Sequence, residues 1–232
     1  VPSTVDAIYA LLLTGNDQLN QSEKITVELG KQTLPVSTTA NPLGYLKYTY
    51  TASEIQPDML NADITQTTDS PSWGGLYLQY FEKFDQVQQQ KGILSVTKKL
   101  FIEKIGSDGK QELLPLGKEK LKTGDKVITR LTLSLKQDMD FLYLKDFRAA
   151  CFEPIGQLSG NQWKFGTVYY EESKDAVTNF FFNSLAKGTY VLEYPVWVNQ
   201  AGTYQDGIAT FQSMYAPEYT AYSEAGKITV TK

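Results

Sequence analysis

Regular alternation of apolar and polar residues is the feature that most constrains this fold. The longest strict run occupies every second position from Val127 to Leu135, the period of a strand with one buried and one wetter face. Similar segments follow one another at residues 94–105, 141–144, 166–171, 177–182, 188–198, 208–213 and 228–231. Short strands separated by turns in this way predict a mainly β protein with an antiparallel β-sandwich.

The residues before this region predict a helix and a smaller β module. Val5, Ile8 and Leu11 recur at the spacing of helical turns, and Gly15 suits the C-terminal cap. The apolar run at residues 11–13 would bury this helix nearly all round, as in the last helix of a larger unit. Alternation then appears at residues 25–29, 46–50, 62–67 and 76–80, and a polar run at residues 88–91 ends it. We predict a helix at 1–15, a β module at 16–91 and a β-sandwich at 92–232.

Charge and composition exclude several classes of function. The chain has 22 Lys and Arg against 26 Asp and Glu, a net charge of −4, so it lacks the positive excess that binds nucleic acid. No apolar run approaches the ~20 residues of a membrane span. The chain has no histidine, which excludes Ser-His and Cys-His catalytic pairs and His metal ligation within these residues. We therefore expect no metal, no cofactor and no nucleic-acid partner.

The remaining candidates for chemistry have structural explanations. Cys151, the one cysteine, lies between Ala150 and Phe152, a setting that favours a buried, inert thiol over a nucleophile. The carboxylates of residues 138 and 140 could hold Ca²⁺ but lack the remainder of an EF-hand loop, so we expect a solvated strand junction. The adjacent carboxylates at 171 and 172 point to opposite faces of a strand and cannot flank one glycosidic bond.

Aromatic residues are the unusual part of the composition, with 15 Tyr, 11 Phe and 3 Trp. We expect Trp73, Trp163 and Trp197 to pack between strands, with an exposed binding platform as the alternative. The run at residues 180–182 places aromatic rings on both faces of one strand. This strand is therefore central in its sheet, or its outer face is covered by another domain.

Met214 and Tyr215 stand where a predicted strand ends before Pro217, which breaks the ladder. No local hydrophobic period explains these two residues. They are either ordinary packing residues or an apolar plug that inserts into a partner domain.

An ordered set of segments resembles the C-terminal macroglobulin domain of bacterial, Bacteroidetes-like alpha-2-macroglobulins. The resemblance is strongest over residues 92–232. Its segments are Gly124-Asp125-Lys126-Val127, Asp138-Met139-Asp140-Phe141, Asp146, Phe152-Glu153-Pro154, Tyr169-Tyr170, residues 180–182, residues 187–194, Gly202-Thr203-Tyr204 and residues 214–218. Residues 3–12 are similar to the closing helix of the family's thioester domain, and residues 25–80 resemble the returning half of its CUB-like domain.

This resemblance implies a non-catalytic part of a protease trap. In the family, a protease cleaves a bait region and is enclosed, and in thioester-bearing members a Cys-Gln thioester couples to it. The chain contains no Cys-x-Glu-Gln motif, so it would supply neither step itself. Its partners would be upstream domains of the parent chain and, through the whole protein, target proteases.

The resemblance assigns a site to Met214 and Tyr215. A Met-Tyr pair at the matching positions shields the thioester from water in bacterial members that have one.

The expected location is the periplasm or cell envelope, with a lipoprotein anchor upstream as one form of attachment. The start at Val1, without Met or a leader, indicates a processed or excised chain. A returning CUB half alone would also show an open sheet edge, through which two copies could dimerise.

The alternative from another class is a stand-alone β-sandwich module that binds carbohydrate or protein through exposed Tyr and Trp. A hydrolase using carboxylates is a third reading, supported by the weak acid pairs alone. Coplanar exposed aromatics would favour sugar binding. An apolar patch around Met214 and Tyr215 would favour the macroglobulin role.

Overall fold

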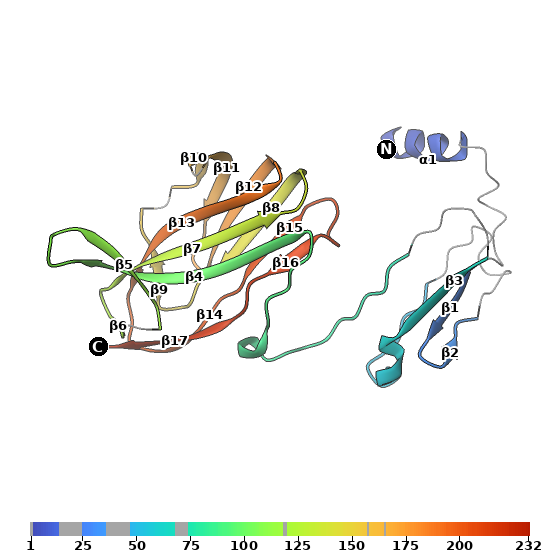
Figure 1. The fold of residues 1–232 in the computed structure, drawn as a ribbon, viewed down its shortest axis with the longest axis horizontal. Coiled ribbons are helices and arrows are strands. Elements are labelled where there is room, and N and C mark those ends of the chain that lie inside the picture. The colour runs from blue at the N-terminus through green and yellow to red at the C-terminus, as the bar shows by residue number, and fades with distance from the viewer. Residues whose placement is uncertain are drawn as a thin grey trace. The chain divides into compact units, whose positions relative to one another are not determined.

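The structure, a computed structural model, describes residues 2–13, 25–35, 47–67, 74–117, 120–156, 158–164 and 166–232. The chain divides into two compact units, one ending at Leu78 and one beginning at Gln79. Most described residues lie in antiparallel strands (Figure 1), which confirms the predicted mainly β class.

The first unit contains the helix α1 (Pro2–Leu13) and a three-stranded sheet. The sheet has the order β2-β1-β3, with a short 3₁₀ helix at Pro57–Leu60 before its last strand; its strands are β1 (Ile25–Leu29), β2 (Gln32–Thr33) and β3 (Ala62–Gln66). All five residues of the edge strand β3 are exposed. The described apolar side chains of α1, such as Ile8 and Leu13, are also exposed.

Two strand predictions before residue 81 are wrong. Residues 47–50 and 76–80 are irregular, and Leu76, Leu78 and Tyr80 are exposed; Leu46 and the predicted cap Gly15 lie outside the described residues. Alternation makes a strand only where a neighbouring strand accepts its backbone hydrogen bonds. No strand of the described residues pairs with these two segments.

The second unit is a β-sandwich. It consists of two sheets, whose strands form separate layers in Figure 1. One sheet has five strands in the order β5-β4-β7-β13-β9. These strands are β4 (Leu94–Ile105), β5 (Gln111–Pro115), β7 (Lys126–Leu135), β9 (Phe152–Pro154) and β13 (Gly188–Val198). A 3₁₀ turn at Phe84–Gln86 precedes it.

The opposite sheet has six strands in the order β10-β11-β12-β8-β15-β16. They are β8 (Met139–Phe147), β10 (Gly160–Lys164), β11 (Thr167–Ser173), β12 (Val177–Leu185), β15 (Ala209–Ser213) and β16 (Thr220–Tyr222). A third, three-stranded sheet has the order β14-β17-β6 and contains the parallel pair β17 and β6: β6 (Leu121–Lys122), β14 (Gly202–Asp206) and β17 (Gly226–Thr231).

The sandwich core follows from the alternation. In β7, Val127, Leu131 and Leu133 are fully buried, as the sequence pattern requires. Phe180 and Phe182 of β12 meet them from the opposite sheet's side of the core, whereas Phe181 faces outward. β12 is an interior strand of its sheet, which agrees with the first of the two explanations expected for aromatic rings on both of its faces. Among the described residues, no helix is long and apolar enough to cross a membrane.

Candidate functional site

Met214 and Tyr215 begin the loop between β15 and β16, and hydrogen bonds fix this loop. The backbone N–H of Ser213 donates to the carbonyl of Tyr219 over 3.0 Å, and that of Tyr219 donates to Ala216 over 2.9 Å. On the other side, the N–H of Met214 donates to the carbonyl of Phe141 in β8 over 2.9 Å. The loop is therefore a continuation of the sheet and not a loose connection.

Three apolar side chains project at this end of the sheet, and we call them the apolar tip: Phe141, Met214 and Tyr215. They are 47%, 50% and 78% exposed, respectively. The rings of Phe141 and Tyr215 meet edge to face, with centroids 5.2 Å apart. Apolar groups held in water by a rigid frame are typical of a surface that another molecule covers.

Phe141 has an unusual backbone conformation. Its φ of 52° lies in the left-handed region, the one such value among described residues other than glycine. This conformation costs about 1–2 kcal/mol for a residue with a Cβ. Phe141 itself has no partner in either strand ladder, but its neighbours Asp140 and Leu142 pair with β12 and β15, and its carbonyl accepts the hydrogen bond from Met214.

Met214 and Tyr215 stand out in the sequence, whereas Phe141 has no role there beyond its predicted strand. Both identified residues are exposed. Their closeness to Phe141 follows from the pairing of β15 with β8, which joins segments about 70 residues apart. A positive φ at an aromatic residue has no local sequence signal.

The outer face of the six-stranded sheet carries a row of aromatic residues. Tyr170, Phe181 and Tyr143 pair directly across β11, β12 and β8. The rings of Phe181 and Tyr143 stack, with centroids 5.0 Å apart. The hydroxyl of Tyr143 donates to Asn179, whose amide donates to Glu172 over 2.8 Å. The amine of Lys174 also lies 3.2 Å from the same carboxylate. The hydrogen bonds from Asn179 and Lys174 lower the pKa of the Glu172 carboxyl.

The expectation that the tryptophans pack between strands is wrong for two of them. Trp163 is 82% exposed and Trp197 is 46% exposed, while Trp73 lies outside the described residues. Trp163 stands on the edge strand β10, where a wide ring has no further strand to pack against.

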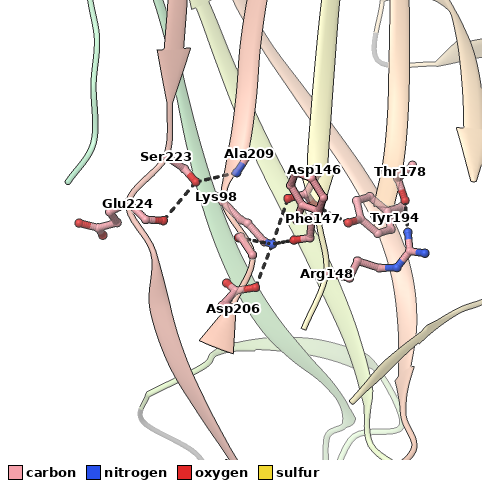
Figure 2. A network of polar contacts seen from close by, with 11 residues as sticks. Lys98, Asp146, Phe147, Arg148, Thr178, Tyr194, Asp206, Ala209, Ser223 and Glu224 are labelled. Carbon is pink, nitrogen blue, oxygen red and sulfur yellow. Dashed lines mark hydrogen bonds and ion pairs between the residues drawn. The ribbon is translucent and has the colours of Figure 1, made fainter. Parts of the chain in front are cut away.

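A second constellation lies inside the sandwich, and we call it the charge cluster: Lys98, Asp146 and Asp206. Figure 2 shows Lys98 of β4 reaching the carboxylates of Asp146 in β8 and Asp206 at the end of β14. The amine nitrogen lies 3.0 Å from Oδ1 of Asp146 and 2.9 Å from Oδ1 of Asp206. It also donates to the carbonyls of Phe147 and Gly207.

Neighbouring polar groups complete the charge cluster. The hydroxyl of Tyr194 donates to Oδ2 of Asp146. Arg148 donates to the hydroxyl of Thr178 (Figure 2). It also donates to the backbone carbonyls of residues 174 and 175. Burial raises the pKa of both aspartates, although Lys98 acts in the opposite direction. The two carboxylates raise the pKa of Lys98, although burial opposes them.

The charge cluster was not identified from the sequence. One signal was present, because Lys98 and Asp146 occupy inward positions of alternating strands, where apolar residues are the rule. Two opposite charges at such positions indicate a buried pair. In the described residues, no three His, Cys, Asp or Glu side chains are grouped to hold a metal ion.

Cys151 is fully buried, as predicted. Burial raises the pKa of its thiol to about 11. The reactive thiolate is therefore disfavoured at neutral pH.

The fold defines a macroglobulin-type β-sandwich. Residues 94–218 match the family described as the bacterial alpha-2-macroglobulin MG10 domain. This match covers more than half of the chain, which therefore belongs to that family. No curated protein matches the chain.

Several solved structures of bacterial alpha-2-macroglobulins are similar to the chain. A mutant of the Salmonella protein is 17% identical over 90% of this chain and 13% of its own, with a TM-score of 0.49. The Salmonella protein reacted with methylamine is 18% identical over 74% of this chain and 10% of its own, with a TM-score of 0.48. Trypsin-activated Escherichia coli alpha-2-macroglobulin is 17% identical over 63% and 11%, with a TM-score of 0.48. The chain thus spans roughly a tenth of the length of these proteins.

Proposed function

We propose that the chain is the non-catalytic MG10 region of an alpha-2-macroglobulin-like protease inhibitor of the cell envelope. In this role the apolar tip docks on a domain elsewhere in the parent protein. The observation that carries the proposal is the exposure of Met214 and Tyr215 on a hydrogen-bonded loop. Membership of the MG10 family supports the same role.

The apolar tip suits a shield for a group that water destroys. A thioester survives only where water is excluded, and aromatic rings beside a flexible thioether can form an apolar cover. The shield can withdraw as a unit when the sandwich moves, since its three residues share one end of one sheet. The helix at residues 1–15 and the module at 16–91 would then belong to the neighbouring thioester and CUB-like domains.

The test uses the full-length parent protein with Tyr215→Ala. We expect faster loss of the thioester, followed as thiol release with methylamine, and weaker trapping of a protease. Tyr77→Ala is the matched control, because Tyr77 is 87% exposed and lies in the other unit. Unchanged thioester lifetime and trapping in Tyr215→Ala would overturn the shielding role.

A stand-alone sugar-binding module remains the competing proposal, and exposed Trp163 is the observation that favours it. The stacked rings of Tyr143 and Phe181 cover each other's faces, so they offer a sugar little platform. An immunoblot of the native protein separates the two proposals. A band several times larger than this chain in the envelope fraction supports the inhibitor, and one of the chain's own size supports the module.

A further inference from the structure

The charge cluster places an amine between two carboxyl groups in a region that water hardly reaches. The side chains of Lys98, Asp146 and Asp206 are 3%, 0% and 15% exposed. Each comes from a different strand, so the fold, and not local sequence, brings them together. Asp146 is among the segments that resemble the macroglobulin domain, but that resemblance gives none of the three residues a chemical role, and the proposed docking role does not use them.

Because the fold already holds the Lys98 amine against the carboxyl groups, a reaction between them needs no diffusional encounter. Contact between an amine and a carboxyl group, exclusion of water and a third group that moves protons between them are the conditions under which an amide bond can form. Lys98 and Asp146 supply the first two groups at 3.0 Å. Asp206 is the third, 2.9 Å from the same nitrogen.

We propose that Lys98 and Asp146 condense to an intramolecular isopeptide bond, with Asp206 as the proton-transfer group. Nζ of Lys98 forms a bond to Cγ of Asp146, and the bond from Cγ to Oδ1 breaks. Of the three ammonium protons, one stays on the amide nitrogen and two leave with Oδ1 as water. The positive and negative charges cancel, and no oxidant or other reactant is consumed.

Two features of the cluster suit this step (Figure 2). The hydroxyl of Tyr194 donates to Oδ2 of Asp146, where it can stabilise negative charge as the carbon becomes tetrahedral. Asp206 is the more exposed of the two aspartates, so the released water has a route out on its side.

Proton transfer inside the cluster supplies the neutral amine. The carboxylates hold the pKa of Lys98 above its usual value, so loss of its proton to bulk water is disfavoured. Burial raises the pKa of Asp146 and Asp206, which makes either carboxylate a better acceptor for that proton. The exchange leaves the total charge of the cluster unchanged.

The bond would join the two layers of the sandwich. Lys98 belongs to the five-stranded sheet and Asp146 to the six-stranded sheet. A covalent link between them closes a long loop and restricts the unfolded chain, as a disulfide does. The chain has a single cysteine and cannot form an internal disulfide.

Mass spectrometry of the purified 232-residue chain tests the proposal. We expect an intact mass lower than the sequence mass by one water, and a branched tryptic peptide that joins Lys98 to Asp146. A full sequence mass in the folded chain would overturn the proposal and leave the cluster as an ion pair.

Loss of water has a second source that the peptide analysis separates. The chain has two Asp-Gly sequences, Asp108-Gly109 and Asp206-Gly207, and each is prone to form a succinimide, which has the same mass loss but contains no branch and is cleaved by hydroxylamine. Mass loss confined to Asp108 or Asp206 therefore also overturns the proposal.

Variants test the assigned roles. Asp206→Asn keeps the reacting pair, and we expect the branched peptide to fall at least tenfold. Lys98→Arg, which retains charge but not the amine, should abolish it. Lys99→Arg is the matched control on the outward face of the same strand and should keep it in full. A branched peptide undiminished in Asp206→Asn would remove the proton-transfer role.

Discussion

The ring of Phe141 meets the ring of Tyr215 edge to face, with planes 88° apart and centroids separated by 5.2 Å. The two residues belong to different strand ends, and the bond from the Met214 N–H to the Phe141 carbonyl holds those ends together. An edge-to-face pair contributes about 0.5–1.5 kcal/mol beyond its buried area. Phe141 therefore orients the most exposed member of the apolar tip.

The backbone conformation of Phe141 predicts which substitutions at this position are the most destabilising. Its φ of 52° is tolerated poorly by β-branched residues. We expect Phe141→Val to be less stable than Phe141→Leu by about 1 kcal/mol, measured by urea denaturation. The same two substitutions at Phe147 serve as the control, because Phe147 is partly exposed on the outer face of the same strand and has no positive φ. Equal stability of the two variants at residue 141 would contradict the assigned backbone strain.

The backbone of Gly207 lies very close to that of Phe147, beside the charge cluster. A Cβ at this position would collide with the backbone carbonyl of Phe147, which cannot rotate away. The carbonyls of Gly207 and Phe147 both accept hydrogen bonds from Lys98. We expect Gly207→Ala to lower the free energy of unfolding by about 1–3 kcal/mol.

Gly226→Ala is the matched control for this substitution, because nothing lies within 4 Å of its added Cβ. Its effect should stay within about 0.5 kcal/mol. Chemical denaturation of both variants measures the difference, and equal losses would mean that the close approach at Gly207 is absent in solution.

Much of the sandwich could be predicted because its strands are long and buried on one face. The predicted strand at residues 188–198 coincides with β13, and the alternation from Val127 lies within β7. Short strands such as β10 and β14 were missed. β10 is mostly exposed and β14 is five residues long, so pairing with neighbours, more than their own apolar pattern, makes them strands.

The two sites differ in how much of them the sequence reveals. Met214 and Tyr215 stand out because an apolar pair follows the end of a strand. Lys98 and the segment containing Asp206 are separated by more than a hundred residues. Only the stacking of the sheets brings them together. The inward positions of Lys98 and Asp146 in alternating strands indicate buried charges, but no local pattern shows that these charges meet Asp206.

The position of Phe211 in the core predicts a large loss of stability when its side chain is truncated. This side chain is fully buried, and its ring meets that of Phe182 at a centroid distance of 6.5 Å. Phe211→Ala should cost about 3–5 kcal/mol, the sum of lost burial and the cavity that remains. Leu158→Ala is the control, because Leu158 is 87% exposed and should change stability by less than about 0.5 kcal/mol. Similar denaturation midpoints for the two variants would contradict the assigned core.

Buried neutral acids predict that the sandwich weakens in alkali. Burial raises the pKa of the Cys151 thiol from 9.0 to about 11 and that of the Tyr169 hydroxyl from 10.0 to about 12. Over these intervals the unfolded chain has released protons that the folded chain still binds. The free energy of unfolding therefore falls as pH rises, first between about pH 9 and 11 and then up to about pH 12.

Cys151→Ala isolates the thiol's part of this effect. The variant lacks the group that titrates, so its free energy of unfolding should fall less steeply than the wild type's from pH 9 to about pH 11. Any packing loss from the smaller side chain is the same at every pH and leaves the slope unaffected. Urea titrations at several pH values, with pH 7 to 8 as the reference interval, provide the slopes. Parallel curves for the two proteins would show that the thiol titrates alike in the folded and unfolded chains, against the burial assigned to it.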